Sequence, residues 1–167
     1  MGRFTNPRDL YFGEGARHEV KNLKGKKAII VSGGSSMRRG GFLQDVEADL
    51  KEGGFEVKLF EGVESDPSIE TVMKGAEAMR EFEPDWIIAI GGGSPIDAAK
   101  VAAARIVRPD KTVAQLGGLL KVRRPLPLFI AVPTTAGTGS EATIAAVVTG
   151  EEHRKYAVSD LCLIPRY

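Results

Sequence analysis

The feature that most constrains the fold is the alternation of short apolar runs with helix-periodic segments along the 167 residues. The run Trp86–Ile90 is apolar throughout, which is typical of a strand covered on both faces of a sheet. It is followed by Gly91-Gly92-Gly93-Ser94 and then by an alanine-rich segment, to about Val107, that predicts a helix. This alternation predicts an α/β domain with a Rossmann-like parallel sheet and flanking helices.

The remaining segments extend the same pattern. Strands are expected at residues 28–32, 55–60, 86–90, 125–132, 142–148 and 156–159. The polar stretch Thr149–Arg154 separates the last two strands and predicts a small β-hairpin region there. Apolar residues recur at helical spacing from Leu43 to Leu50 and from Ile69 to Phe82, and Asp66-Pro67 has the pattern of an N-cap followed by a first-turn proline.

Length and charge narrow the class of protein. A chain of this size predicts one domain over residues 1–167, and a net charge of +1 gives no footprint for nucleic acid. No apolar run approaches the ~20 residues needed to cross a bilayer, so no membrane association is expected. Met1–Asp9 has no apolar signal core, and Cys162 is the only cysteine, so a cytoplasmic protein is expected.

The glycine loop is the sharpest candidate site. Glycines allow a ligand to approach the backbone closely, and the free amides at the start of the next helix attract an anion such as a pyrophosphate. Ser94 suits the N-cap, Pro95 the first helical position, and Asp97 the first turn. The alternative is a plain tight turn before a well-capped helix. Lys100 is expected either to neutralise a phosphate or to pair with Asp97.

A second polar loop follows the strand at 125–132. Pro133–Glu141 offers four hydroxyls, two glycines and one carboxylate within nine residues. Such a loop can surround a ribose or pyrophosphate with hydroxyl and amide donors, and the alternative is a solvated linker. Its position between two buried strands favours the binding loop.

A third loop, Ser32–Ser36, follows the first predicted strand. An NAD site usually places an acidic residue on the ribose 2′-hydroxyl. From Ser32 to Leu43 there is no Asp or Glu, whereas Arg38 and Arg39 are present. Hydroxyls and guanidinium groups suit a 2′-phosphate, so NADP is favoured and NAD remains possible; the alternative is two exposed arginines at a helix start.

The apolar run Leu161–Ile164 stops close to the last residue, Tyr167. Two interpretations are open: a domain cut from a longer chain, or a C-terminal edge strand.

Together the loops resemble the iron-containing (group III) alcohol dehydrogenase family. The resemblance is carried by GGGSPIDAAK at 91–100 and PTTAGTGSEAT at 133–143, with softer matches in FGEGA at 12–16 and SDPS at 65–68. It implies an N-terminal dinucleotide-binding domain that is normally followed by an all-helical, metal-binding domain.

The family pattern also implies roles for single residues. It places Gly92, Gly93 and Ser94 on the pyrophosphate, Lys155 on the nicotinamide ribose, and Gly33 where NAD-preferring members carry an aspartate. The complete set of residues predicted to bind the cofactor is Gly33, Gly34, Ser35, Arg38, Asp66, Gly91, Gly92, Gly93, Ser94, Asp97, Thr134, Thr135, Thr138, Thr143 and Lys155.

The family's metal ligands, one aspartate and usually three histidines, belong to the helical domain, which is absent from residues 1–167. This chain has only His18 and His153, far apart in sequence, so no metal site is predicted in it.

By resemblance the function is hydride transfer between a small alcohol or aldehyde and NADP. The alternatives are a non-catalytic NADP(H)-binding module and a nucleotide or phosphosugar binder. A homodimer, or association through an exposed face of the domain, is also expected.

Overall fold

The computed structural model describes residues 9–167. The prediction that Met1–Asp9 contains no signal core therefore falls almost entirely outside the described residues. No helix within the described residues has both the length and the apolar character that crossing a membrane requires.

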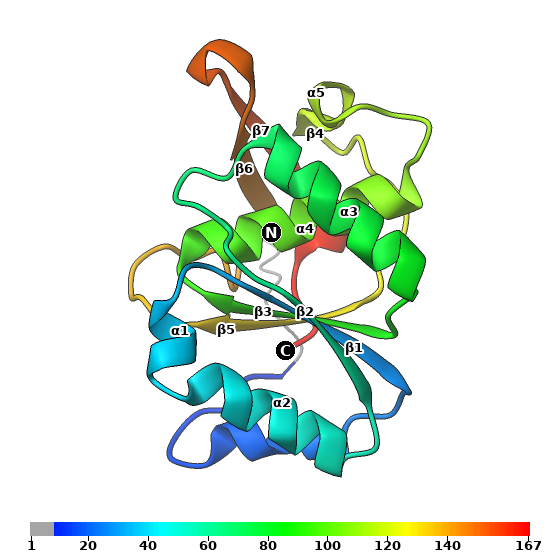
Figure 1. Ribbon diagram of the computed structural model, residues 1–167. Coiled ribbons are helices and arrows are strands. Elements are labelled where there is room, and N and C mark those ends of the chain that lie inside the picture. The colour runs from blue at the N-terminus through cyan, green and yellow to red at the C-terminus, as the bar shows by residue number, and fades with distance from the viewer. Residues whose placement is uncertain (1–8) are drawn as a thin grey trace, which may run out of the picture.

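A four-stranded parallel sheet forms the centre of the domain, as predicted (Figure 1). Its strands are β1 (Lys27–Ser32), β2 (Glu56–Phe60), β3 (Trp86–Gly91) and β5 (Leu128–Pro133). They lie in the order β2-β1-β3-β5. Because β1 and β3 are central and covered on both faces, their sequences are almost continuously apolar.

Helices cover both faces of this sheet (Figure 1). On one face lie the 3₁₀ helix η1 (Ala16–Asn22), the short helix α1 (Ser36–Arg39) and α2 (Phe42–Glu52); on the other lie α3 (Ile69–Phe82) and α4 (Gly93–Val107). Alternate residues of one strand enter opposite cores. Ile29 packs in the core under α3 and α4, whereas Ile30 packs in the core under α2.

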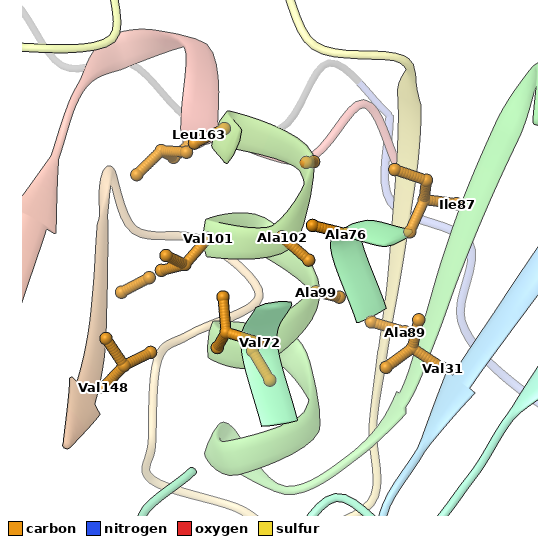
Figure 2. Close-up of a cluster of buried hydrophobic side chains, with 14 of the residues drawn as sticks. Val31, Val72, Ala76, Ile87, Ala89, Ala99, Val101, Ala102, Val148 and Leu163 are labelled. Atoms are coloured by element: carbon orange, nitrogen blue, oxygen red, sulfur yellow. The ribbon is translucent and has the colours of Figure 1, made fainter. Parts of the chain in front are cut away.

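The core between α3, α4 and the sheet is built largely from small side chains. Figure 2 shows Ala76 of α3 beside Ala99 and Ala102 of α4, with Val31 and Ala89 of the sheet close by. Small residues let the two helices lie close to each other and to the strands. The alanine-rich sequence of α4 therefore fixes the helix tightly against β3, the strand that leads into the glycine loop.

A second, three-stranded sheet confirms the predicted hairpin and adds to it. β6 (Ala145–Thr149) and β7 (Lys155–Ser159) are antiparallel around a tip at η2 (Glu151–His153), and β4 (Gly118–Leu119) pairs parallel with β7. β4 and the preceding short helix α5 (Val113–Leu116) were not predicted. β6 begins three residues later than expected, because residues 142–144 are irregular.

Two predicted helix N-caps are wrong. Ser68, not Asp66, caps α3: its side chain accepts a hydrogen bond from the Thr71 amide. Asp66 has φ 55°, and the Pro67 carbonyl accepts from the Thr149 amide at 2.8 Å, which holds this segment against β6 rather than in the helix.

At α4 the N-cap is Gly92, so Ser94 and Pro95 are the second and third helical residues. A proline is tolerated there because the first-turn amides have no partner within the helix.

The C-terminal residues do not form the edge strand that was one of the two interpretations of this segment. Leu161–Leu163 form a 3₁₀ helix, η3, so an edge strand at 161–164 is wrong. Pairing begins only at the last two residues, where the Arg166 amide donates to the Phe129 carbonyl at 2.7 Å and the Ala131 amide to the Tyr167 carbonyl at 2.9 Å. The Tyr167 ring stacks on Trp86, with ring centroids 5.7 Å apart.

Candidate functional site

The three predicted loops meet at one edge of the parallel sheet (Figure 1). Ser32 is opposite Ile90, and Gly91 is opposite Pro133, so the loops after β1, β3 and β5 leave neighbouring strand ends. The chain turns from β1 toward β2 on one side and from β3 toward β5 on the other. This topological switch point is where open α/β sheets bind their ligands.

The glycine loop is tied to the loop after β5 and lies against its hydroxyls. The Thr134 amide donates to the Gly91 carbonyl at 2.9 Å. A Cβ atom on Gly92 would lie 3.0 Å from Thr135 Oγ1, and one on Gly93 would lie 3.1 Å from Ser140 Oγ. The two loops therefore lie so close together that a side chain at either glycine would press on a hydroxyl of the second loop.

The start of α4 lies where the two loops meet. Its N-cap, Gly92, has no side chain, so no side chain caps the first amides of the helix. Free amides together with the positive end of the helix dipole form an anion site. These uncapped amides, beside glycines that carry no side chain, fit a dinucleotide pyrophosphate.

The threonines of the second loop supply hydroxyls near the glycine loop. Thr134, Thr135, Thr138 and Thr143 are exposed. The Thr138 hydroxyl accepts from the Ser140 amide at 3.3 Å, and the Thr143 hydroxyl donates to the Ala145 carbonyl at 3.3 Å. Ser140 is buried against Gly93 and was not singled out from the sequence, because an exposed and a buried serine have the same pattern in a polar loop.

Asp97 and Lys100 make hydrogen bonds to the chain between Ser140 and Val147. The Asp97 carboxylate accepts from the Val147 amide at 2.9 Å, and its Oδ1 is buried with no hydrogen-bond partner in the described residues. Burial raises the pKa of Asp97, against the opposing effects of its hydrogen bonds and of the Lys100 charge. The Lys100 ammonium donates to backbone carbonyls of Ser140, Thr143 and Ala145, so neither predicted role for it describes its contacts.

The loop after β1 leaves open space above Gly34, whereas a Cβ atom on Gly33 would lie 3.5 Å from the Val63 carbonyl oxygen; Ser35 is exposed beside them. Arg38 is engaged elsewhere: its guanidinium bonds both carboxylate oxygens of Glu61, with Nε 2.9 Å from Oε1. These hydrogen bonds lower the pKa of Glu61. Glu61 follows β2 directly and was not predicted, since it is 23 residues from Arg38.

Two further predicted residues, Asp66 and Lys155, form an exposed ion pair across 89 positions of sequence. The pair joins the segment before α3 to the first residue of β7. Sequence alone offered no reason to connect them.

Metal ligands are not gathered in the described part of the chain. Among residues 9–167, no group of three or more His, Cys, Asp or Glu side chains could hold a metal ion. His18 Nδ1 lies 3.0 Å from Asp49 Oδ2, which attaches η1 to α2, and His153 is at the hairpin tip, far along the chain.

Comparison with known proteins gives a consistent picture. The family model described as iron-containing alcohol dehydrogenase matches residues 7–167. The chain is 52% identical over 168 residues to the NADPH-dependent butanol dehydrogenase of Clostridium saccharobutylicum, covering 99% of this chain and 43% of that protein. It is 34% identical over 169 residues to NADH-dependent butanol dehydrogenase A of Clostridium acetobutylicum, covering 98% and 43%.

Solved structures of alcohol-oxidising enzymes superimpose closely on this chain. A 1,3-propanediol oxidoreductase superimposes with a TM-score of 0.92 at 33% identity, over 99% of this chain and 44% of that one. The alcohol dehydrogenase from Oenococcus oeni gives a TM-score of 0.88 at 34% identity, over 98% and 44%. The chain thus spans less than half the length of these relatives.

Proposed function

The chain belongs to the iron-containing alcohol dehydrogenase family, and from that premise we propose that it is the dinucleotide-binding part of an NADP-dependent alcohol dehydrogenase. One observation carries the proposal: the glycine loop, with the uncapped first amides of α4, meets the hydroxyl-rich loop after β5 at the switch point of the sheet. The pyrophosphate of a dinucleotide cofactor fits amides of this kind.

In this proposal each loop binds a different part of the cofactor. The amides of Gly93 and Ser94 donate to the pyrophosphate, while Thr135 and Thr138 flank it with hydroxyls. Thr134 and Thr143 line the path toward the nicotinamide. Lys155, oriented by Asp66, binds the nicotinamide ribose.

A bound nicotinamide supplies the hydride chemistry, and the protein contributes position and electrostatics. The residues of this chain hold the pyrophosphate on amides and keep the two loops at a fixed separation. The side chains of residues 9–167 do not fit a metal site. Metal ligands in a helical domain remain an expectation from the family.

The preference for NADP is supported by the loop after β1. No side chain at Gly33 competes for the adenosine ribose, Ser35 is in the same loop, and Arg38 is in α1, which follows it. The relative at 52% identity is named as NADPH-dependent, whereas the one at 34% is named as NADH-dependent. The 2′-phosphate would replace the Glu61 carboxylate as the partner of Arg38.

A Gly33→Asp variant should reverse this preference. A Cβ atom at position 33 meets only the Val63 carbonyl at 3.5 Å and the Pro95 ring at 4.0 Å, so a carboxylate fits there. It would repel the 2′-phosphate of NADPH and accept from the 2′-hydroxyl of NADH. We expect NADPH to bind about tenfold more weakly and NADH to bind more tightly, a change of ~1.4 kcal/mol for the former. Both dissociation constants are measured by fluorescence titration.

Gly33→Asn is the matched control, because it has the same size without the charge. If the ratio of the NADPH and NADH dissociation constants is the same in Gly33→Asp as in Gly33→Asn, position 33 does not select the cofactor.

The function itself is tested by titrating the protein with NADPH and by assaying alcohol oxidation with and without a divalent metal. NADPH binding without turnover identifies a binding module. Metal-dependent turnover contradicts the module and supports an enzyme. An absence of NADPH binding at millimolar concentration would overturn the proposal and leave the nucleotide or phosphosugar binder.

Substrate, location and assembly stay predictions. A small alcohol or aldehyde is proposed because the relatives are named as butanol or aldehyde-alcohol dehydrogenases. A cytoplasmic location is proposed from the single cysteine. For association through an exposed face, the structure offers an apolar groove of about 770 Å³ beside β5, lined in part by Tyr11, Phe12, Trp86 and Tyr167.

A further inference from the structure

Lys100 is the most deeply buried charged side chain among the described residues, with no exposed surface. It lies seven residues after the start of α4, two helical turns from the glycine loop. Its Nζ is 2.6 Å from the Ser140 carbonyl, 2.8 Å from that of Thr143 and 3.2 Å from that of Ala145. An ammonium has three N–H donors, so these three bonds use its whole capacity.

The three carbonyls belong to residues 140–145, the segment that leads into β6: residues 140–144 are irregular, and Ala145 is the first residue of the strand. Buried backbone carbonyls need donors, and here a side chain provides them. Thr138 and Thr143, two of the residues proposed to line the cofactor, lie just before and within this segment. Lys100 thus bonds the segment directly to the helix whose first turn forms the pyrophosphate site.

We propose that Lys100 is a positioning residue, which holds the 138–145 segment at a fixed distance from the glycine loop and thereby sets the affinity for the dinucleotide. The inference rests on the proposed function. A direct role for Lys100 on a phosphate is inconsistent with its burial and with the full use of its donors on carbonyls.

The charge of Lys100 makes this role dependent on pH. Burial lowers its pKa to about 8, while the carboxylates of Asp97 on α4 and Glu141 on the bound segment act in the opposite direction. Above that pH the neutral amine has two N–H donors and a lone pair, so one of the three carbonyls loses its donor and faces the lone pair instead. The segment is therefore held less firmly in alkaline solution.

The test compares NADPH affinity in the unchanged protein, Lys100→Met and Arg105→Met. Arg105 is the matched control: it is a second buried cation on α4 that also donates to carbonyls, those of Arg108 and Lys111, but at the far end of the helix. We expect the NADPH dissociation constant to rise about tenfold in Lys100→Met, as for a typical coupling between sites, and to change little in Arg105→Met.

The second measurement is the pH profile. In the unchanged protein the dissociation constant should rise between about pH 7 and about pH 9, and Lys100→Met should lack this rise. Equal affinity of Lys100→Met and the unchanged protein would overturn the inference. So would a flat profile in the unchanged protein, a result that needs no variant to fold.

The two levels of failure are distinguishable. If the unchanged protein binds no NADPH, the proposed function fails and this inference fails with it. If the unchanged protein binds NADPH and loss of Lys100 has no effect on affinity or on its pH profile, only the inference fails.

Discussion

A Gly92→Asp variant is expected to bind NADPH at least ~100-fold more weakly than the unchanged protein, with no loss of stability. The new side chain would lie between the glycine loop and the hydroxyl-rich loop, since its Cβ would be 3.0 Å from Thr135 Oγ1. A carboxylate about 5 Å from the pyrophosphate costs roughly 3 kcal/mol at an effective dielectric constant near 20. It also accepts the Ser94 amide, which then cannot donate to the cofactor.

Although Gly92→Asp is expected to lower the affinity for NADPH, it is expected to leave the stability of the fold unchanged or slightly raised. Gly92 has φ −76° and ψ −162°, an extended conformation that any residue adopts, and it is the N-cap of α4. Aspartate at an N-cap is better than glycine by a few tenths of a kcal/mol. Thermal unfolding of Gly92→Asp should therefore occur at the same temperature as in the unchanged protein or slightly above it.

Gly92→Asn separates charge from size in this experiment. The asparagine side chain caps the helix and has the same size as aspartate without the negative charge. Gly92→Asn should therefore lose distinctly less affinity for NADPH than Gly92→Asp. If Gly92→Asp and the unchanged protein bind NADPH equally well, the glycine loop is not the pyrophosphate site.

The largest effect on stability is expected from Gly91→Ala, one residue earlier. Gly91 has φ +144°, a conformation that side chains of L-residues rarely adopt. An added Cβ would lie 2.5 Å from Cγ of Pro95, whose ring cannot rotate away. Backbone strain and overpacking each cost about 1–3 kcal/mol, so the free energy of unfolding should fall by roughly 3 kcal/mol or more. Urea denaturation measures it.

Gly54→Ala isolates the backbone part of this cost. Gly54 also has a positive φ, +87°, but a Cβ there meets no atom within 4 Å. It should cost only ~1 kcal/mol.

The double variant Gly91→Ala/Pro95→Ala removes the contact with Cγ and should recover part of the loss. If Gly91→Ala is no more destabilising than Gly54→Ala, the loop moves freely and does not have the tight geometry described.

Much of the fold followed from patterns that are local in sequence. The strands β1 and β3 are continuous apolar runs, and the stripe from Ile69 to Phe82 is a helical repeat, so composition over a few residues determines each. Parallel strands then bring their carboxyl ends to one edge. For that reason the order of strands and polar loops along the chain is enough to predict that the three loops lie together.

The features that the sequence did not predict depend on contacts between segments that are distant along the chain. The N-cap moved from Asp66 to Ser68 because the hairpin holds Pro67, 82 positions before Thr149, by a backbone bond. Glu61 reaches Arg38 across 23 residues, and Lys100 reaches Ser140 across 40. No local period encodes such partners, because they depend on how the loops pack after the strands are in place.

The single tryptophan is a natural fluorescent reporter for a ligand bound at the other end of β3. Trp86 begins the strand and Gly91 ends it, so their Cα atoms are about 17 Å apart at ~3.3 Å per residue. That separation is short enough for resonance energy transfer from the indole to a reduced nicotinamide, without contact between them. Occupancy of the loop is then visible as quenched indole emission and sensitised cofactor emission, in an unlabelled protein. Because the indole is also stacked on Tyr167, the same chromophore reports unfolding when no ligand is present.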